Sequence, residues 1–334
     1  MIKLQRKRIV FRVIGSNEVG MGHIYRTLSL AHEITDHEVI FVTDTKNATA
    51  VNELTSYDYR LEIFDPDDVI DSILALKPNL VVNDILNTDL EDVLPLQAIG
   101  SVVVNFEDLG EGAKVANVTI NELYDEPQFQ GTNTYWGNRY FFVRDEFVNA
   151  VPCKFEDKVE AMLLAFGGVD QHDLTSKILH TILDTCRSRN IHVYVVTGPG
   201  YSPYKELTTK IDRLDGVTLT HATGVISKIM EKVSLAITSN GRTVYEMAHM
   251  NIPAIVIPQH EREQTHAFAC EENGFIALKP YEENITETEV LKALKHLLDN
   301  PNYRRSLYNK TIPYRFDKNK EWVINLLDRL LQES

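Results

Sequence analysis

Short runs of apolar, often β-branched residues alternate with segments of helical period along most of this chain. Strands are predicted at residues 8–14, 38–42, 80–83, 101–105, 161–166, 192–197, 217–220, 235–238 and 254–257. Helices are predicted at residues 23–34, 66–76, 173–184, 203–214, 225–232, 243–250, 263–273, 286–299 and 318–331. This alternation is typical of βαβ units and predicts an α/β fold with parallel sheets covered by helices.

The alternation restarts after a polar, proline-containing stretch at residues 149–158, which is the predicted linker. A chain of 334 residues is long enough for two domains with separate cores. We predict two doubly wound, Rossmann-like domains, residues 1–150 and 151–334, facing each other across a cleft. The terminal helix is a candidate to cross back to the first domain. Ligands of such sheets bind beyond the carboxyl ends of the strands.

The composition argues against several classes of protein. A net charge of −14 is unfavourable for binding nucleic acid or an anionic membrane. The three cysteines, Cys153, Cys186 and Cys270, form no paired motif. No apolar run approaches the roughly 18–20 residues of a membrane span. We expect a cytoplasmic protein with no transmembrane segment, no nucleic-acid partner, no metal and no cofactor; its oligomeric state stays open. The run from His260 to Gln264 resembles a zinc motif but lacks its second histidine.

The first predicted strand leads into Gly20-Met21-Gly22-His23 and then directly into a helix. Glycines at this place let backbone N–H groups approach an anion such as phosphate. Tyr25 replaces the third glycine of a dinucleotide-binding loop. A histidine in the first turn of a helix is disfavoured as a cation, and a neutral imidazole can act as a general base. The alternative is a tight turn with a histidine that only caps or packs.

Two loops of the second half also contain glycine and lie between a predicted strand and a predicted helix. One contains Gly167 and Gly168, and the other runs from Ser239 to Thr243. A diphosphate could bind the amides of residues 241–243 with help from Arg242, and Glu246 could accept hydrogen bonds from ribose. The alternative for Glu246 is a solvated carboxylate. Carboxylates at predicted strand ends are further candidates for the cleft or for helix caps: Asp44, Asp84, Glu107 and Asp108.

In combination these segments resemble a known family. The segments are residues 20–26, 141–147 (FFVRDEF), 166–170 (FGGVD) and 240–246, followed by residues 251–253 and Gln264. They are similar to the family of the UDP-sugar hydrolase of pseudaminic acid biosynthesis and of spore-coat polysaccharide glycosyltransferase-like proteins. The similarity covers roughly residues 23–274.

The resemblance implies a GT-B architecture, a metal-independent reaction and His23 as the general base. It implies uracil near Val225 and Ile226, ribose on Glu246, and diphosphate on residues 239–243 with help from Gly22. The predicted nucleotide- and substrate-binding residues are Gly20, Gly22, Arg26, Asp84, Gly167, Gly168, Val225, Ile226, Ser239, Asn240, Gly241, Arg242, Thr243, Glu246 and Gln264.

The leading hypothesis is hydrolysis of a UDP-linked amino-deoxy sugar, in nonulosonic acid or surface-glycan biosynthesis. The sequence departs from the hydrolase pattern at Asp84-Ile85-Leu86, where the hydrolase has aspartate, histidine and tyrosine. The sugar and the choice between water and an acceptor therefore stay open, as does UDP against CMP or dTDP. One alternative is a glycosyltransferase with a carbohydrate acceptor, and another is a non-catalytic nucleotide-sugar-binding partner.

Overall fold

The structure, a computed structural model, describes residues 6–16, 20–131 and 133–333. Its contacts divide the chain into two compact units. Unit 1 comprises Met1–Arg144 together with Lys318–Ser334, and unit 2 is Asp145–Asp317. The division after Arg144 lies six residues before the end of the predicted first domain, and the C-terminal helix belongs to unit 1.

Unit 1 is built on a seven-stranded parallel sheet with the order β3-β2-β1-β4-β5-β6-β7. Its strands are β1 (Arg8–Val13), β2 (Glu38–Asp44), β3 (Arg60–Phe64), β4 (Leu80–Asp84), β5 (Val102–Phe106), β6 (Val118–Asn121) and β7 (Thr134–Trp136). The strand order reverses between β1 and β4. In open parallel sheets such a switch point is where ligands bind.

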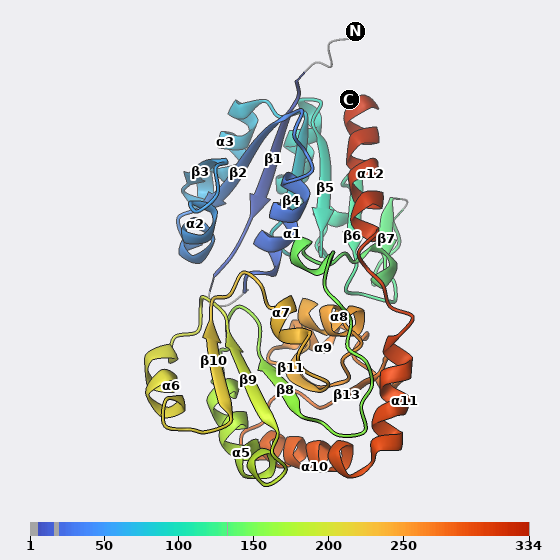
Figure 1. Cartoon of the computed structure of the whole chain (residues 1–334). Helices are drawn as coiled ribbons and strands as arrows, with labels where there is room; N and C mark the ends of the chain where they lie inside the picture. Colours follow the sequence, from blue (N-terminus) through green and yellow to red (C-terminus); the bar gives the residue numbers. More distant parts are fainter. Residues whose placement is uncertain (1–5, 17–19, 132, 334) are drawn as a thin grey trace. The chain divides into compact units, whose positions relative to one another are not determined.

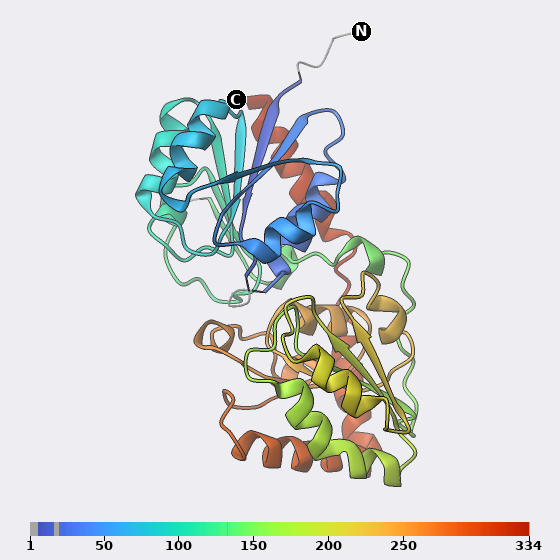
Figure 2. The ribbon, with the colours of Figure 1, turned by 90° about the vertical axis from the view of Figure 1, so that its left-hand side faces the viewer.

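Helices cover both faces of this sheet (Figures 1 and 2). One face is covered by α1 (Gly22–Ala31), α2 (Ala48–Leu54) and α12 (Asn319–Glu333), which share one apolar core with the strands. The other face is covered by α3 (Val69–Leu76) and α4 (Leu90–Ala98) through Val69, Ile73, Val93 and Leu96. The C-terminal helix contributes Val323, Leu326, Leu327 and Leu331 to the first core, which explains why it belongs to unit 1.

Unit 2 is built on a six-stranded parallel sheet with the order β10-β9-β8-β11-β12-β13. Its strands are β8 (Ala161–Ala165), β9 (His192–Thr197), β10 (Val217–His221), β11 (Ala236–Ser239), β12 (Ala254–Ile257) and β13 (Phe275–Ala277). Here the order reverses between β8 and β11. The predicted fold class, two doubly wound Rossmann-like domains, is confirmed.

The core of unit 2 packs α5 (Leu174–Ser188), α6 (Tyr204–Ile211) and α10 (Ile285–Asp299) against the sheet. The remaining helices are α7 (Ser227–Met230), α8 (Arg242–His249), α9 (Glu261–Gln264) and α11 (Pro301–Thr311). Short 3₁₀ turns are η1 (Pro66–Asp68), η2 (Gly112–Lys114), η3 (Asn138–Tyr140), η4 (Asp145–Phe147) and η5 (Glu271–Asn273). The helix predicted over residues 263–273 is wrong, because only α9 and η5 form there.

Candidate functional site

The first candidate site lies at the switch point of unit 1. The loop after β1 leads into α1, and His23 is in the first turn of this helix. Asp84 is the last residue of the neighbouring strand β4. Nδ1 of His23 lies 2.5 Å from Oδ1 of Asp84, and both side chains are buried. The fold thus joins two residues that are far apart in the sequence.

The charge of Asp84 decides the tautomer of His23. Burial alone would raise the pKa of Asp84, but Arg26 and His23 outweigh it and lower this pKa to about 2. The carboxylate is therefore ionised at neutral pH, and the proton of the short hydrogen bond belongs to Nδ1 of His23. Nε2 then carries a lone pair, and it has no hydrogen bond among the residues that the structure describes. This is the arrangement in which a carboxylate orients a histidine as a base.

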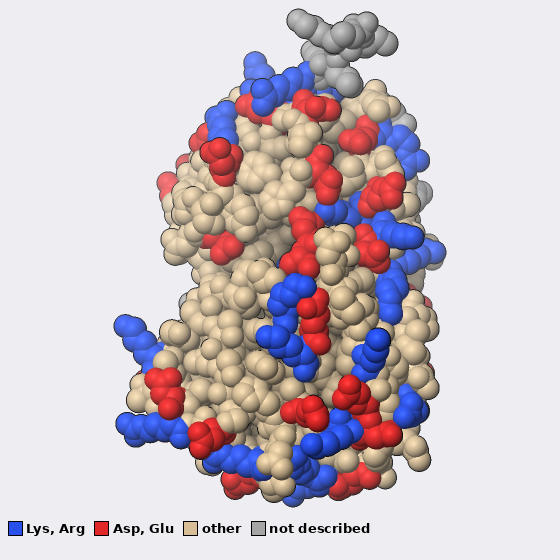
Figure 3. Space-filling view, in the orientation of Figure 1, with Lys and Arg blue, Asp and Glu red and all other residues tan. Residues whose placement is uncertain are grey.

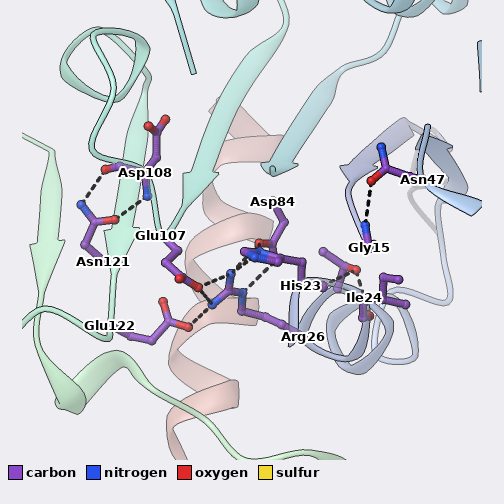
Figure 4. Close-up of polar contacts among 11 residues, drawn as sticks. Gly15, His23, Ile24, Arg26, Asn47, Asp84, Glu107, Asp108, Asn121 and Glu122 are labelled. Atoms are coloured by element: carbon purple, nitrogen blue, oxygen red, sulfur yellow. Dashed lines mark hydrogen bonds and ion pairs between the residues drawn. The ribbon is translucent and has the colours of Figure 1, made fainter. Parts of the chain in front are cut away.

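Arg26, one turn further along α1, is surrounded by three carboxylates (Figure 4). Its Nε donates to Oδ2 of Asp84 at 2.7 Å. Its terminal nitrogens Nη2 and Nη1 contact Glu107 at 3.3 and 3.4 Å, and Nη1 also forms an ion pair with Glu122. Burial acts against the charge of Arg26, but Asp84, Glu122 and Glu107 outweigh it and raise the pKa of the guanidinium.

The sequence predicts that Arg26 and Asp84 contact the substrate, and the structure assigns them another role. Arg26 is 1% exposed and Asp84 is 0% exposed. Both side chains are committed to the ion-pair cluster of Arg26, Asp84, Glu107 and Glu122. Asp84 therefore orients the ring of His23, and Arg26 holds Asp84 in place.

The backbone of Glu107, a member of this cluster, is strained. It follows β5 directly and has a φ of 53°, in the left-handed region that side chains other than glycine rarely adopt. Leu86, two residues after β4, has a φ of 69°. Such conformations cost of order 1–3 kcal/mol and concentrate at functional sites. The carboxylate of Glu107 reaches Arg26 from this strained turn.

A second buried network lies behind the cluster and joins three strand ends. Nδ2 of Asn83 donates to Oδ1 of Asn105 at 3.0 Å, and Nδ2 of Asn105 donates to Asp108 at 2.7 Å. Asn121 and Asp108 exchange backbone and side-chain hydrogen bonds at 2.8 and 2.9 Å (Figure 4). Thr88 donates to Asp108 at 2.6 Å. These bonds fix the ends of β4, β5 and β6, and with them the spacing of the three carboxylates.

The depressed pKa of Asp84 predicts a specific acid sensitivity of unit 1. A carboxylate whose pKa is lower in the folded state stabilises the fold above its ordinary pKa of 3.8, and this contribution is lost as the pH falls toward 2. We expect Asp84→Asn to cost roughly 2–3 kcal/mol more at about pH 6 than at about pH 2. Urea unfolding of both proteins at the two pH values measures this difference. An equal cost at both pH values would contradict the assigned ionisation.

The second candidate site lies at the switch point of unit 2. The loop after β8 contains Gly167 and Gly168; β11 ends at Ser239, and the loop after it contains Gly241. A β-carbon at Gly167 would lie 3.8 Å from Oγ of Ser239. The two glycine loops therefore adjoin, and the second one opens α8, whose first backbone amides have no acceptor within the helix.

Asn240 is used inside the protein rather than toward a ligand. Its Nδ2 donates to the backbone oxygens of Glu263 and His266 at 2.7 and 2.9 Å. Nδ1 of His266 donates to the backbone oxygen of Asn240 at 2.8 Å. Oε2 of Glu263 accepts from the amides of Asn240 and Gln259 at 3.3 and 2.8 Å. This side chain therefore shapes the loop, and a contact of Asn240 with nucleotide stays a prediction.

The other predicted residues occupy varied environments. Gly20 lies just before α1 and Gly22 is its first residue, and Gly241, Arg242 and Thr243 are partly exposed at the start of α8. Val225 is 47% exposed and Ile226 is 7% exposed, next to α7. Glu246 is 3% exposed, and Gln264 is exposed at the end of α9. Ligand contacts of all these residues stay predictions.

Gly198 permits a close contact that sequence reasoning missed. It follows β9, and a β-carbon on it would lie 2.4 Å from both Cα and the backbone oxygen of Gly168. We expect Gly198→Ala to lower the melting temperature of unit 2 by about 5 °C or more, because backbone must move. The matched control is Gly224→Ala, where a β-carbon meets nothing within 4 Å. Equal melting temperatures of the two variants would contradict this packing.

In residues 6–16, 20–131 and 133–333, no three or more histidine, cysteine, aspartate or glutamate side chains gather as a metal site. No helix in this same part of the chain is long and apolar enough to cross a membrane. On the face shown in Figure 3, basic and acidic side chains are interspersed.

The sequence is similar to one domain family and to proteins from two organisms. Residues 162–319 match the Glycosyltransferase family 28 C-terminal domain. The uncharacterized protein MJ1062 of Methanocaldococcus jannaschii is 27% identical over 270 residues, which cover 75% of this chain and 55% of the relative. The chain thus spans about half the length of that relative. The spore coat polysaccharide biosynthesis protein SpsG of Bacillus subtilis is 22% identical and is matched over 78% of this chain and 80% of its own length.

Solved structures share the fold over nearly the whole chain. MurG of Acinetobacter baumannii has a TM-score of 0.68 at 13% identity, covering 97% of this chain and 99% of that one. A putative UDP-N-acetylglucosamine 2-epimerase from Listeria monocytogenes has a TM-score of 0.65 at 13% identity, covering 99% and 98%. HepE of Anabaena, in complex with UDP-glucose, has a TM-score of 0.61 at 11% identity, covering 97% and 100%.

The chain has the GT-B fold, and its residues 162–319 are similar to a glycosyltransferase domain. All but the last two residues of the domain match lie in unit 2, and the fold match extends over both units. The glycine loops and His23 of this GT-B protein could be predicted from the sequence. The carboxylates Glu107 and Glu122 around Arg26 were not identified as its partners, although Glu107 was noted at a strand end.

Proposed function

We propose that this protein transfers a sugar from a nucleoside diphosphate donor to a hydroxyl group of a carbohydrate acceptor, with His23 as the general base. The observation that carries the proposal is the hydrogen bond of 2.5 Å between His23 and the ionised Asp84 at the switch point of unit 1. It supplies a basic Nε2 in a buried, oriented ring. Such positioned bases contribute typically about 10²–10⁴ to a rate.

The chemistry follows from this base. Nε2 of His23 takes the proton of the acceptor hydroxyl while the acceptor oxygen forms a bond to the anomeric carbon of the donor sugar. The bond between that carbon and the phosphate oxygen breaks, and the nucleoside diphosphate leaves with the bonding electrons. The imidazolium that forms is stabilised by the adjacent carboxylate of Asp84, which stays ionised.

Unit 2 is the proposed donor site. The adjoining loops at Gly167 and Gly241 offer backbone amides, and the amino terminus of α8 adds its dipole to stabilise a diphosphate. Arg242 is partly exposed at that place and would add a charge-assisted contact. The bound UDP-glucose of HepE supports a UDP-linked donor for this fold.

Transfer to an acceptor is favoured over hydrolysis, the leading hypothesis from the sequence. The matched domain of residues 162–319 is a glycosyltransferase domain. The relative SpsG is named for polysaccharide biosynthesis. Both support an acceptor that is part of a glycan. Hydrolysis uses the same base with water in place of the acceptor, so the two reactions differ in the nucleophile and therefore in their products.

Product analysis separates these functions. The full-length protein is incubated with UDP-, dTDP- and CMP-sugars, each with and without a mixture of oligosaccharide acceptors, and the products are identified by mass spectrometry. We expect a glycosylated acceptor and free nucleoside diphosphate only when both substrates are present. Free sugar without acceptor would indicate hydrolysis. Nucleotide binding without any turnover would overturn the proposal in favour of a binding partner.

A further inference from the structure

The chain passes between the two units twice, and the proposed chemistry uses neither passage. The first connecting segment starts at Asp145 and continues to about residue 153; the second covers residues 314–317. The first also contains the end of the FFVRDEF motif, to which the proposed reaction assigns no role. Within unit 2, both connecting segments are hydrogen-bonded to the same residue, His249, at the end of α8.

Both ring nitrogens of His249 are engaged. Nδ1 accepts a hydrogen bond from the backbone amide of Phe316 at 3.2 Å. Because Nδ1 is the acceptor, Nε2 carries the proton, and the ring donates to the backbone oxygen of Phe147. The ring of Phe147 also lies edge-on to the imidazole at 6.4 Å. His249 is 4% exposed, so water offers these backbone groups little replacement.

Neighbouring bonds strengthen both attachments. In the first connecting segment, the amide of Cys153 donates to the backbone oxygen of Met250 at 2.8 Å. In the second, Arg315 donates to the backbone oxygen of His249 at 3.1 Å and to Oδ1 of Asn251 at 2.9 Å. All acceptors belong to the last turn of α8 or to the two residues that follow it. The end of this helix is therefore the common point of attachment.

The first connecting segment is also bonded to α7. Oε2 of Glu146 accepts from the amide of Ser227 at 3.0 Å, and the amide of Val151 donates to Oε1 of Glu231 at 3.0 Å. Ser227 is the first residue of α7, and Ile226 precedes it. The motif residue Glu146 thus connects this segment to the loop where the resemblance places the nucleotide base.

We infer that His249 is a positioning residue that joins both connecting segments to the nucleotide-binding helix α8. The amino terminus of this helix carries Gly241–Thr243, the proposed diphosphate site, and its carboxyl terminus carries His249. The part that concerns nucleotide rests on the proposed function. The reaction uses His23 of unit 1 and a donor bound by unit 2, so both connections affect turnover more than donor affinity.

The attachment requires a neutral imidazole, because a protonated Nδ1 cannot accept from Phe316. Burial lowers the pKa of His249 below its ordinary value of 6.5, and Arg315 lowers it further. Asp317, the bond to Phe147 and Glu246 act in the opposite direction. Since the pKa is lower in the folded state, the attachment is complete above pH 6.5 and is lost as the pH falls through the folded-state pKa.

The test compares three substitutions in the full chain. His249→Phe keeps a ring and removes both hydrogen bonds. His249→Asn places an amide oxygen near the position of Nδ1, and His249→Gln places an amide nitrogen near that of Nε2. Amide hydrogen exchange of residues 145–153 and 312–318, corrected for intrinsic rates, is measured with and without UDP. UDP affinity is measured by calorimetry on the same samples.

In His249→Phe we expect exchange in both segments to rise by about tenfold or more. His249→Asn restores protection at Phe316, and in that variant the protection no longer decreases with acid. His249→Gln restores the hydrogen bond to the backbone oxygen of Phe147 and with it the protection of residues 145–153. Where turnover is found, kcat decreases in His249→Phe while the UDP affinity stays within about twofold of wild type.

Unchanged exchange of both segments in His249→Phe would overturn the inference. So would increased exchange that neither amide variant reverses, because the effect would then be general loosening. If wild type binds no UDP, the proposed function fails, but the exchange measurements without nucleotide still decide the role of His249.

Discussion

Arg26→Met is expected to lower the free energy of unfolding of unit 1 by at least about 3–5 kcal/mol, because it leaves buried carboxylates without their cation. Asp84, Glu107 and Glu122 are each less than 10% exposed, and all three contact this one guanidinium. Natural domains are stable by only about 5–15 kcal/mol. The variant should therefore be soluble only in part and should melt at a much lower temperature.

Arg60→Met is the matched control. Arg60 also contacts two carboxylates, Glu38 and Glu62, but its side chain is 48% exposed. Exposed ion pairs contribute about 0–1 kcal/mol. Urea unfolding monitored by circular dichroism compares the two variants. A loss at Arg26 as small as that at Arg60 would show that the carboxylates tolerate the absence of the cation.

His23→Ala is expected to reduce kcat by about 10²–10⁴, because the reaction loses its general base. UDP affinity should remain within about twofold of wild type, because the proposed nucleotide loops belong to unit 2. Arg26 keeps its bonds to Asp84 in this variant, so the fold is expected to persist. Steady-state turnover and calorimetry on the same preparation separate the two effects.

His32→Ala provides the control on the same helix. His32 is exposed at the carboxyl-terminal end of α1, away from the switch point. Its removal should leave kcat unchanged. If His23→Ala retains most of the wild-type kcat, another group takes the proton and the assignment of the base is wrong.

The sequence predicted the fold class because its signals are local. The strand β8 is apolar throughout, and β1 and β4 each contain a run of three apolar residues. The helices α5 and α10 have a clear helical period. Short elements escaped prediction. β7 and β13 have three residues each, and α4 contains Pro95. The segment at residues 263–273 has a helical period, but Glu263 and His266 bond to Asn240 and hold it as a loop.

The glycine loops of the candidate site could also be predicted from the sequence, because their signals are local. The glycines before His23 and those at Gly167 and Gly241 form local motifs at strand ends. The partners of Arg26 come from the ends of three strands, and their meeting depends on the strand order. A sequence alone cannot distinguish an arginine that binds phosphate from one that neutralises buried carboxylates. The sequence predicts Arg26 as a ligand contact, whereas the structure places it among three buried carboxylates.

The pH dependence of kcat/KM tests the central claim, that His23 oriented by Asp84 is the base, most directly. The profile is measured from about pH 5 to about pH 9 with the donor and acceptor that product analysis identifies. For wild type, kcat/KM should fall on the acid side, because a protonated imidazole accepts no proton. The residual rate of His23→Ala should lack this acidic limb. A wild-type rate that stays constant over the whole range would contradict the account.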